Sequence, residues 1–279
     1  MTGTLYLVGT PIGNLGDFSP RALETLEQAD FIAAEDTRVT LKLLTHFGIK
    51  KPLVSYYEHN RASSGERILI RLQAGESCAL VTDAGMPAIS DPGEDLVRLC
   101  RDAGIPVRVV PGPSSVVSAL ALSGLPTGRF TFEGFLSVTK KSRFDHLNSL
   151  VGETRTMVFL EAPHKLRYTL RDMLEVFGDR QITLSRELTK IHEETLHLTL
   201  AQACAMYEET DPRGEYVLCV HGAEPENEPE MNLEQALTVV SRYRDSGLSL
   251  KDAAKRASEE TGFSKKALYD AAIRAAREE

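Results

Sequence analysis

Alternation between short apolar runs and amphipathic stretches, over the first 110 residues, most constrains how this chain can fold. Apolar runs recur five times, and between them apolar side chains repeat at helical spacing. The runs cover residues 5–8, 31–34, 53–57, 78–82 and 107–110. Strands that alternate with helices favour a parallel sheet with helices on its faces. We therefore predict an α/β fold whose first sheet is rich in parallel strands.

The second half of the chain has a different pattern. After a break at residues 124–126, five strand-like runs follow with fewer helical stretches between them. They cover residues 130–135, 156–160, 182–186, 195–200 and 216–220. The clearest helix begins at Pro163 and places Leu166 and Leu170 on one apolar face. This pattern predicts a second α/β domain with a mixed sheet.

Four segments are expected along the chain. They are an N-terminal α/β domain at residues 1–113, a C-terminal α/β domain at 114–222, an acidic linker at 223–232 and a three-helix appendage at 233–279. The linker places prolines among glutamates, which is typical of a solvated connection. In the appendage, Ser249 and Ser264 are N-cap candidates, and two helices meet at residues 261–263 in the manner of a helix-turn-helix. Because its charges nearly balance, we expect packing or a dimer contact through its small residues rather than RNA docking.

The composition is that of an ordinary globular protein, with 42% hydrophobic and 26% charged residues among 279. No window approaches 18 uninterrupted apolar residues, so we expect no membrane span and no membrane partner. The N-terminus lacks the pattern of a secretory signal. The four cysteines lie far apart in apolar runs, as buried reduced thiols do. These features predict a cytoplasmic protein without a disulfide framework.

Irregular polar segments follow four of the five strands predicted for the first domain. They are VGTPIGNL (8–15), AAEDTR (33–38), DAGMPAISDPG (83–93) and PGPSS (111–115). VGTPIGNL matches neither the GxGxxG nor the GxxxxGK[ST] pattern, so the common dinucleotide and P-loop sites are not indicated. Each segment alone is also explained as a stiff connector or a helix cap. Since ligands of open α/β sheets bind beyond the carboxyl ends of the strands, the four together predict a ligand site.

Together with FEGFL (132–136) and RELTK (186–190), these segments resemble the tetrapyrrole methylase superfamily, and within it the family that methylates a ribose 2′-hydroxyl of 16S ribosomal RNA. The resemblance covers residues 4 to about 222, and a helical appendage also occurs in that family. Met86 departs from the pattern, because the family usually has threonine there; this removes a hydroxyl contact but not the role of the loop backbone.

The resemblance implies S-adenosylmethionine bound in a cleft between two α/β domains. It implies transfer of a methyl group to a cytidine 2′-hydroxyl of 16S rRNA, near the decoding site of the small ribosomal subunit, and a homodimer. By motif position it also implies nine residues against the methyl donor: Pro11, Asp83, Gly85, Pro87, Ile89, Ser114, Ser115, Gly214 and Glu215.

Candidate catalytic residues come from AAEDTR and RELTK, which both place acids beside bases. They are Glu35, Asp36, Arg38, Glu187 and Lys190. A ribose hydroxyl is a poor nucleophile at neutral pH, so a proton acceptor or a charge-stabilising group assists its reaction. Each of these charges is equally explained as a member of a structural ion pair.

A basic patch lies within an acidic chain. The formal net charge is −8, yet residues 138–171 hold seven Lys/Arg against three acids. We interpret five of them as candidates for RNA contact, although a run of charge is usually a solvated surface: Lys140, Lys141 and Arg143, which precede a predicted helix, and Arg167 and Arg171. No metal site is expected, since residues 192–197 read HExxxH rather than HExxH.

Two other functions stay open. One is a small-molecule, tetrapyrrole-type methyltransferase that also uses S-adenosylmethionine; TPIGNL, AAEDTR and the appendage disfavour it. The other is a non-catalytic RNA-binding protein that retains the fold, and binding of the methyl donor would exclude it.

Overall fold

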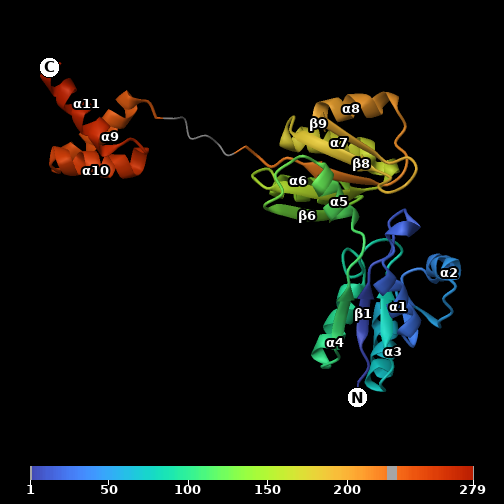
Figure 1. Cartoon of the computed structure of the whole chain (residues 1–279). Coiled ribbons are helices and arrows are strands. Elements are labelled where there is room, and N and C mark those ends of the chain that lie inside the picture. The colour runs from blue at the N-terminus through green and yellow to red at the C-terminus, as the bar shows by residue number, and fades with distance from the viewer. Residues whose placement is uncertain (1, 225–230, 279) are drawn as a thin grey trace. The chain divides into compact units, whose positions relative to one another are not determined.

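The computed structural model describes residues 2–224 and 231–278, with side chains of the last helix described to Ala275 (Figure 1). The chain divides into two compact units, Met1–Ala223 and Glu224–Glu279. Both sheets belong to the first unit, so the boundary expected at residue 113 stays a prediction. Residues 225–230 of the expected acidic linker lie outside the described residues. Among the helices described, none has the length and hydrophobicity that crossing a membrane requires.

The first sheet is parallel. Its strands are β1 (Leu5–Val8), β2 (Phe31–Ala34), β3 (Leu53–Ser55), β4 (Cys78–Val81) and β5 (Val107–Val110). They lie in the order β3-β2-β4-β1-β5, with each neighbouring pair parallel. β2 and β4 are buried along their whole length, as expected for strands that are covered on both faces. The predicted parallel sheet is confirmed.

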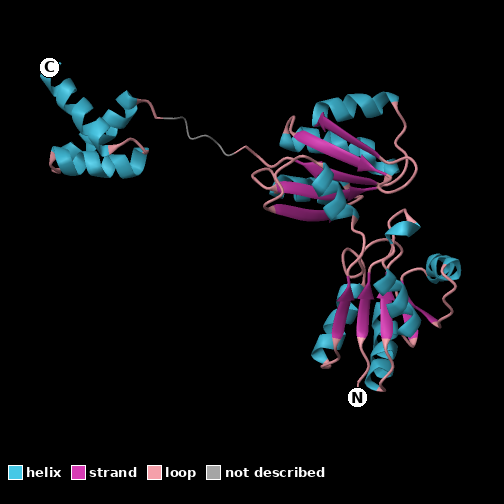
Figure 2. Ribbon diagram, in the orientation of Figure 1, coloured by secondary structure: helices cyan, strands magenta, loops and turns pink. Residues whose placement is uncertain are grey.

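Helices cover both faces of this sheet (Figure 2). After the 3-10 turn η1 (Leu15–Asp17), α1 (Pro20–Gln28) and α2 (Thr37–His46) pack on one face. On the other face lie α3 (Arg61–Gln73) and α4 (Gly93–Asp102). The helix that follows β4 therefore lies opposite the helices that follow its neighbours β1 and β2. Loops diverge at such a point, and open α/β sheets bind their ligands there.

The second sheet is mixed. Its strands are β6 (Phe130–Phe135), β7 (Thr156–Glu161), β8 (Gln181–Arg186), β9 (Glu194–Thr199) and β10 (Tyr216–Val220). They lie in the order β6-β7-β10-β8-β9, with β6 and β7 parallel and the other neighbours antiparallel. α5 (Ser115–Leu122) covers one face, and α6 (Lys140–Ser149), α7 (Pro163–Phe177) and α8 (Leu200–Glu209) cover the other. The predicted mixed α/β fold is confirmed.

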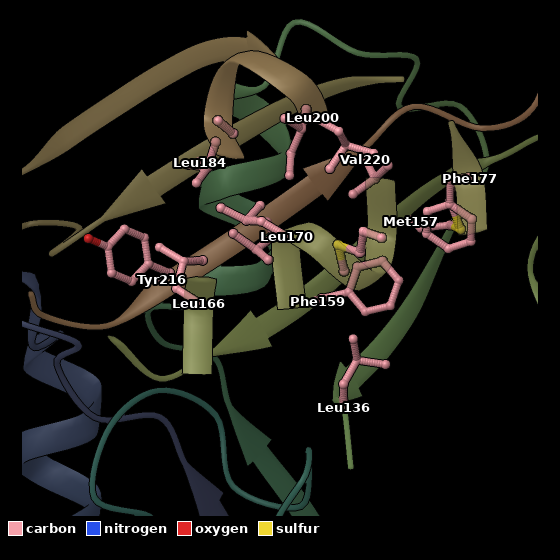
Figure 3. Packing of buried hydrophobic residues seen from close by; sticks show 14 of the residues in the cluster. Leu136, Met157, Phe159, Leu166, Leu170, Phe177, Leu184, Leu200, Tyr216 and Val220 are labelled. Atoms are coloured by element: carbon pink, nitrogen blue, oxygen red, sulfur yellow. The ribbon is translucent and has the colours of Figure 1, made fainter. Parts of the chain in front are cut away.

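The face under α7 forms the largest apolar cluster of this sheet. Leu166 and Leu170 of α7 and Phe159 of β7 belong to this cluster, which Figure 3 shows, and all three are fully buried. Truncating such a leucine to alanine costs roughly 2–5 kcal/mol, because a close-packed core collapses only partly around the gap. This cluster holds the end of β7 and the beginning of β10 in place.

The second unit consists of α9 (Leu233–Asp245), α10 (Leu250–Thr261) and α11 (Lys265–Glu278). Ser249 and Ser264 accept hydrogen bonds from backbone N–H groups of α10 and α11, so both predicted caps are confirmed. Gly262 ends α10 with a φ of +74°, a conformation that glycine adopts without strain. The small residues Ala253, Ala254 and others of α9 and α10 are buried in the unit's own core. Of the two roles expected for these small residues, packing or a dimer contact, the structure shows packing.

Candidate functional site

A cavity of about 490 Å³ lies at the carboxyl ends of β2 and β4, a volume typical of small-molecule sites. The first sheet contributes the residues after β2 and the β4–α4 loop, and the second contributes β6, the end of β7 and the start of β10. A smaller hollow of about 100 Å³ shares part of this lining and reaches the N-terminus of α5. Three of the four segments from which the sequence predicted a ligand site, those after β2, β4 and β5, contribute to these linings, whereas no residue of VGTPIGNL (8–15) does.

The β4–α4 loop is fixed against the end of β1. Thr10 and Gly85 exchange backbone hydrogen bonds of 2.9 and 3.1 Å, and Gly85 has a φ of +87°. Beside them, a Cβ on Gly9 would lie 2.7 Å from the Cα of Gly112, so only glycine lets these two segments approach. The Met86 sulfur accepts a hydrogen bond from the Gly112 N–H at 3.2 Å. The unusual methionine therefore joins two loops of the site.

Two non-glycine residues of this loop have left-handed backbone, Ala88 with a φ of +67° and Ser90 with +62°. Such residues cost roughly 1–3 kcal/mol each and persist only where their surroundings hold them. Asp91 does so, since its Oδ1 accepts hydrogen bonds from the N–H groups of Ala88 at 2.9 Å and Gly93 at 2.7 Å. Its Oδ2 is buried without a partner among the described residues, and Asp91 lines the cavity. Burial raises the pKa of Asp91 in spite of its backbone hydrogen bonds.

Glu35 and Asp83 add two further carboxylates to the lining. Thr82 donates its hydroxyl hydrogen to Glu35 at 2.6 Å, and Asp83 accepts from the Asp36 N–H at 3.1 Å. Burial, followed by the charge of Glu35, raises the pKa of Asp83. A lining of this kind suits a cationic ligand or one with hydroxyl groups, because the carboxylates gain a partner when it binds.

Asp36 and Arg38 pair with one another outside the cavity lining. The Asp36 carboxylate caps α2 and accepts from Arg38 Nε at 3.0 Å. Hydrogen bonds from Arg38 lower the pKa of Asp36 to about 2, which makes it a weak proton acceptor. The Arg38 side chain is 87% exposed. Of the three candidate catalytic residues in AAEDTR, Glu35 therefore lines the cavity, and Asp36 and Arg38 do not.

The RELTK segment forms a second strained turn, with φ of +50° at Glu187 and +65° at Thr189. Lys190 Nζ lies 3.0 Å from Glu187 Oε1 and 3.4 Å from Glu215 Oε2. Burial alone would raise the pKa of Glu187, but its bonds to Lys190 and to the Glu215 N–H outweigh it, and the pKa is lowered. Glu187 and Lys190 line a separate small hollow. Glu215 lines both this hollow and the main cavity.

The residues predicted against the methyl donor fall into three groups. Four line the main cavity: Asp83, Ile89, Ser115 and Glu215. Gly85 and Ser114 line the smaller hollow, and Ser114 also caps α5 by accepting from the Val117 N–H at 3.4 Å. Pro11, Pro87 and Gly214 are described but lie outside both linings. Gly214 supports the second turn, because a Cβ there would lie 2.5 Å from Glu187 Cγ.

The predicted RNA-contacting residues of α6 need a correction. Lys140 and Lys141 are exposed, and they form the first turn of α6 rather than preceding it. Arg143 is only 5% exposed, and its Nε donates to Asp172 at 2.6 Å. The prediction for Arg143 is wrong, because a buried guanidinium paired with a carboxylate does not reach a phosphate. It fastens α6 to α7.

Arg167 and Arg171 lie one turn apart on α7, as the sequence predicted. Arg167 donates to the Tyr207 carbonyl oxygen at 2.6 Å and to Asp211 at 2.7 Å. Arg171 lies 3.5 Å from Glu208, with both side chains exposed. Part of each guanidinium thus faces α8 and its following loop, and RNA contact by these two residues stays a prediction.

Glu161, at the end of β7, was not predicted from the sequence. It lines the cavity although it is only 2% exposed, and it accepts from Thr169 Oγ1 at 2.6 Å and the Ala162 N–H at 2.9 Å. Lys165 Nζ lies 3.5 Å from it. The signal was present, since a carboxylate at the end of a strand, directly followed by alanine, repeats the pattern seen at Asp83. Phe135, 55% exposed, is a second unpredicted lining residue.

No group of three or more His, Cys, Asp or Glu within the described part of the chain is arranged to hold a metal ion. His197, part of the HExxxH segment, lies in β9 with Nδ1 3.1 Å from Thr183 Oγ1. The absence of a catalytic metal stays a prediction.

Two models of known protein families match this chain. The model of tetrapyrrole (corrin/porphyrin) methylases matches residues 4–204, and that of the RsmI C-terminal HTH domain matches residues 234–276. The ribosomal RNA small subunit methyltransferase I of Synechocystis sp. is 47% identical, covering 97% of this chain and 98% of the relative. The chain belongs to the ribosomal RNA small subunit methyltransferase I family. Another member, from Thermotoga maritima, is 48% identical over 222 residues, covering 80% of this chain and 100% of the relative.

Solved structures share the fold of this methyltransferase I family member at low identity. The uroporphyrin III C-methyl transferase of Thermus thermophilus has a TM-score of 0.56 at 19% identity and covers 78% of this chain and 97% of its own. A structure of that enzyme complexed with S-adenyl homocysteine has a TM-score of 0.55 at 20% identity, with the same coverage. At these identities the likeness is one of fold.

Proposed function

We propose that this chain transfers a methyl group from S-adenosylmethionine to ribosomal RNA of the small subunit. The observation that carries the proposal is the 47% identity, over nearly the whole chain, to a ribosomal RNA small subunit methyltransferase I. The cavity at the strand ends supports it, since the fold that this chain shares with the Thermus enzyme holds S-adenyl homocysteine in that protein.

In this proposal the methyl donor contacts Asp83, Gly85, Ile89, Ser114, Ser115 and Glu215, while Pro11, Pro87 and Gly214 shape the loops behind them. S-adenosylmethionine supplies a methyl group on a positively charged sulfonium. The acidic lining fits such a cation, and the buried, unpartnered Oδ2 of Asp91 is available to accept a hydrogen bond. Asp83→Ala with Gly85→Val should abolish donor binding in calorimetry; unchanged affinity would remove this assignment.

The acceptor that we propose is the 2′-hydroxyl of a cytidine ribose in 16S rRNA, near the decoding site. Aligning two reactants supplies roughly 7–11 kcal/mol of a barrier, so most of the lining serves orientation. Among the predicted catalytic residues, Glu35 alone lines the cavity, and Thr82 fixes its carboxylate. We assign Glu35 as acceptor of the ribose proton, with Asp36 holding Arg38 toward RNA phosphate, and Lys190 with Glu187 positioning Glu215.

The RNA would also contact Lys140 and Lys141 on α6, with Arg167 and Arg171 as further contacts. Each phosphate that a lysine neutralises steepens the salt dependence of binding by about 0.7–0.9 logarithmic units. A homodimer is part of the same proposal, and sedimentation at micromolar concentration tests it independently.

The decisive experiment maps ribose 2′-O-methylation on 16S rRNA from cells with and without this protein. One cytidine near the decoding site should lose its methyl group when the protein is absent. An unchanged methylation map, together with methyl transfer from labelled donor to a porphyrinoid, would overturn the proposal in favour of a small-molecule methyltransferase.

A further inference from the structure

The second unit is separable from the methylase fold. The Thermotoga relative carries the same name as the Synechocystis relative, yet its whole length aligns with only 80% of this chain over 222 residues. The first unit, Met1–Ala223, has nearly the same length, and it contains the cavity and both sheets. The helices α9 to α11 have a hydrophobic core of their own. What the second unit contributes is therefore expected to lie outside the methyl transfer itself.

An apolar docking role does not fit this unit. Its alanines are buried in its own core. Among its described residues, Leu233 is the single large hydrophobic side chain that is exposed, at 40%. Any partner must therefore be held mainly by polar and charged groups.

Charge is unevenly distributed over the three helices. α9 has two arginines and two acids, and α10 has three bases and three acids. α11 has four bases and two acids. Arg242 of α9 is paired with Glu260 of α10. Among the described residues, Lys265, Lys266 and Arg274 of α11 form no ion pair, and neither do Lys251, Lys255 and Arg256 of α10. The helices differ in net charge, because bases and acids balance in α9 and in α10, whereas α11 has two more bases than acids.

α11 is also the second helix of a helix-turn-helix. Gly262 and Phe263 form the turn after α10, and Phe263 packs against the core of the unit. In this motif the N-terminal residues of the second helix face the nucleic acid, while the first helix supports it. Lys265 and Lys266 occupy those positions. Tyr269, one turn further on, is half-buried at the edge of the core.

We propose that α11 is an RNA-binding surface in which Lys265 and Lys266 contact phosphates and Tyr269 is available to stack on an unpaired base. This rests on the proposed function, in which the substrate is ribosomal RNA. The major groove of an A-form helix is too narrow for side chains to read, so the contacts fall on backbone and single-stranded bases. Such a surface adds affinity for the RNA and leaves the chemical step to the first unit.

The test uses the full chain with Lys265→Glu and Lys266→Glu. A matched control carries Arg244→Glu and Arg256→Glu, exposed residues of α9 and α10 that give the same change in net charge. Binding to 16S rRNA fragments and to small subunits is measured from about 50 to 200 mM salt. The α11 variant should bind about tenfold more weakly, and its salt slope should fall by about 1.4, the sum for two single-strand phosphate contacts. The control should bind as the unaltered chain does.

Further measurements separate this inference from the proposed function. Donor affinity and kcat at saturating substrate should be unchanged in the α11 variant, while KM for the RNA substrate rises. Equal weakening by both variants, or an unchanged salt slope in the α11 variant, would overturn the inference and leave the methylation assay untouched. Weakened binding to small subunits with unchanged binding to bare RNA would identify a ribosomal protein as the partner, and that also overturns it. Circular dichroism confirms that each variant is folded.

Discussion

Two loops of the first unit contain all four non-glycine residues with a positive φ in the described chain, and they are held in different ways. In the β4–α4 loop, one carboxylate group of Asp91 binds two backbone N–H groups and lies in the cavity lining. In the turn after β8, Glu187 accepts a hydrogen bond from the Glu215 N–H, and ion pairs of Lys190 with Glu187 and with the largely exposed Glu215 add to the bracing. Hydrogen bonds to buried main chain are insensitive to salt, whereas exposed ion pairs are screened. The first loop is therefore expected to be the more rigid of the two.

The largest effect is expected from Asp91→Ala. Hydrogen bonds to a charged group contribute roughly 1.5–3 kcal/mol each, and loss of both releases Ala88 and Ser90 from their strained conformation. Donor affinity should fall about a hundredfold or more in calorimetry, since tenfold corresponds to about 1.4 kcal/mol. Asp91→Asn keeps the Oδ1 acceptor and should lose less than about tenfold. Equal losses in both variants would mean that the loop does not depend on this bracing.

Lys190→Met tests the second turn and should have a smaller effect. It removes the partner of Glu187 and of Glu215, the residue that links this turn to the cavity. We expect kcat to fall about tenfold through misplacement of the turn, with donor affinity altered by less than about threefold. Lys190→Arg retains the charge and serves as the control. A kcat unchanged by the methionine substitution would separate this turn from the reaction.

The two loops should also respond to pH in opposite ways. The pKa of Asp91 is raised by burial, so its charge destabilises the fold once the pH rises above the unfolded value of 3.8. Asp91→Asn should then raise the Tm by about 1–3 °C at pH 7, and the gain should vanish below pH 3.8. The pKa of Glu187 is lowered, so its stabilisation is complete above 4.5 and is lost as the pH falls through the folded pKa. Glu187→Gln should therefore lower the Tm at pH 7 and leave it unchanged in strong acid. Shifts of the same sign at pH 7 would contradict this contrast.

The smallest effects, on the free energy of unfolding, are expected from substitutions that only relieve backbone strain. Ser90→Gly and Thr189→Gly each allow the observed φ without cost, but each also gives the unfolded chain more freedom. The two contributions nearly cancel, and urea denaturation should show changes within about 1 kcal/mol. A loss well above that value at either position would show that the side chain makes a contact of its own.

The strands and their ends were predictable from the sequence, because a buried strand must be apolar and the residue that leaves the sheet need not be. β1, β2 and β5 begin and end where the apolar runs do. The strain of the β4–α4 loop was not predictable, since Ala88 and Ser90 are not the glycine or asparagine that usually marks a left-handed residue. Asp91, which holds this loop, was also explained as a cap of the helix that follows.

The limit of prediction from the sequence is clearer for the charged residues. Lys140, Lys141 and Arg143 belong to one basic run, yet Arg143 alone faces inward toward Asp172, 29 residues further along the chain. A contact of that kind depends on how two helices pack, which a local pattern of charge does not contain. The sequence did contain the signal for Glu161, a carboxylate at the end of a strand, and only the weight placed on the first sheet concealed it.

The contact of Gly9 with Gly112 restricts how this sequence can vary. A methyl group on Gly112 would lie 2.8 Å from the backbone of Gly9, so the obstruction is mutual. Because neither residue has a side chain, a substitution at one position cannot make room for a side chain at the other. Compensating pairs of mutations, by which contacting residues ordinarily change together, are not open to this pair, and both glycines must persist for as long as these two loops meet.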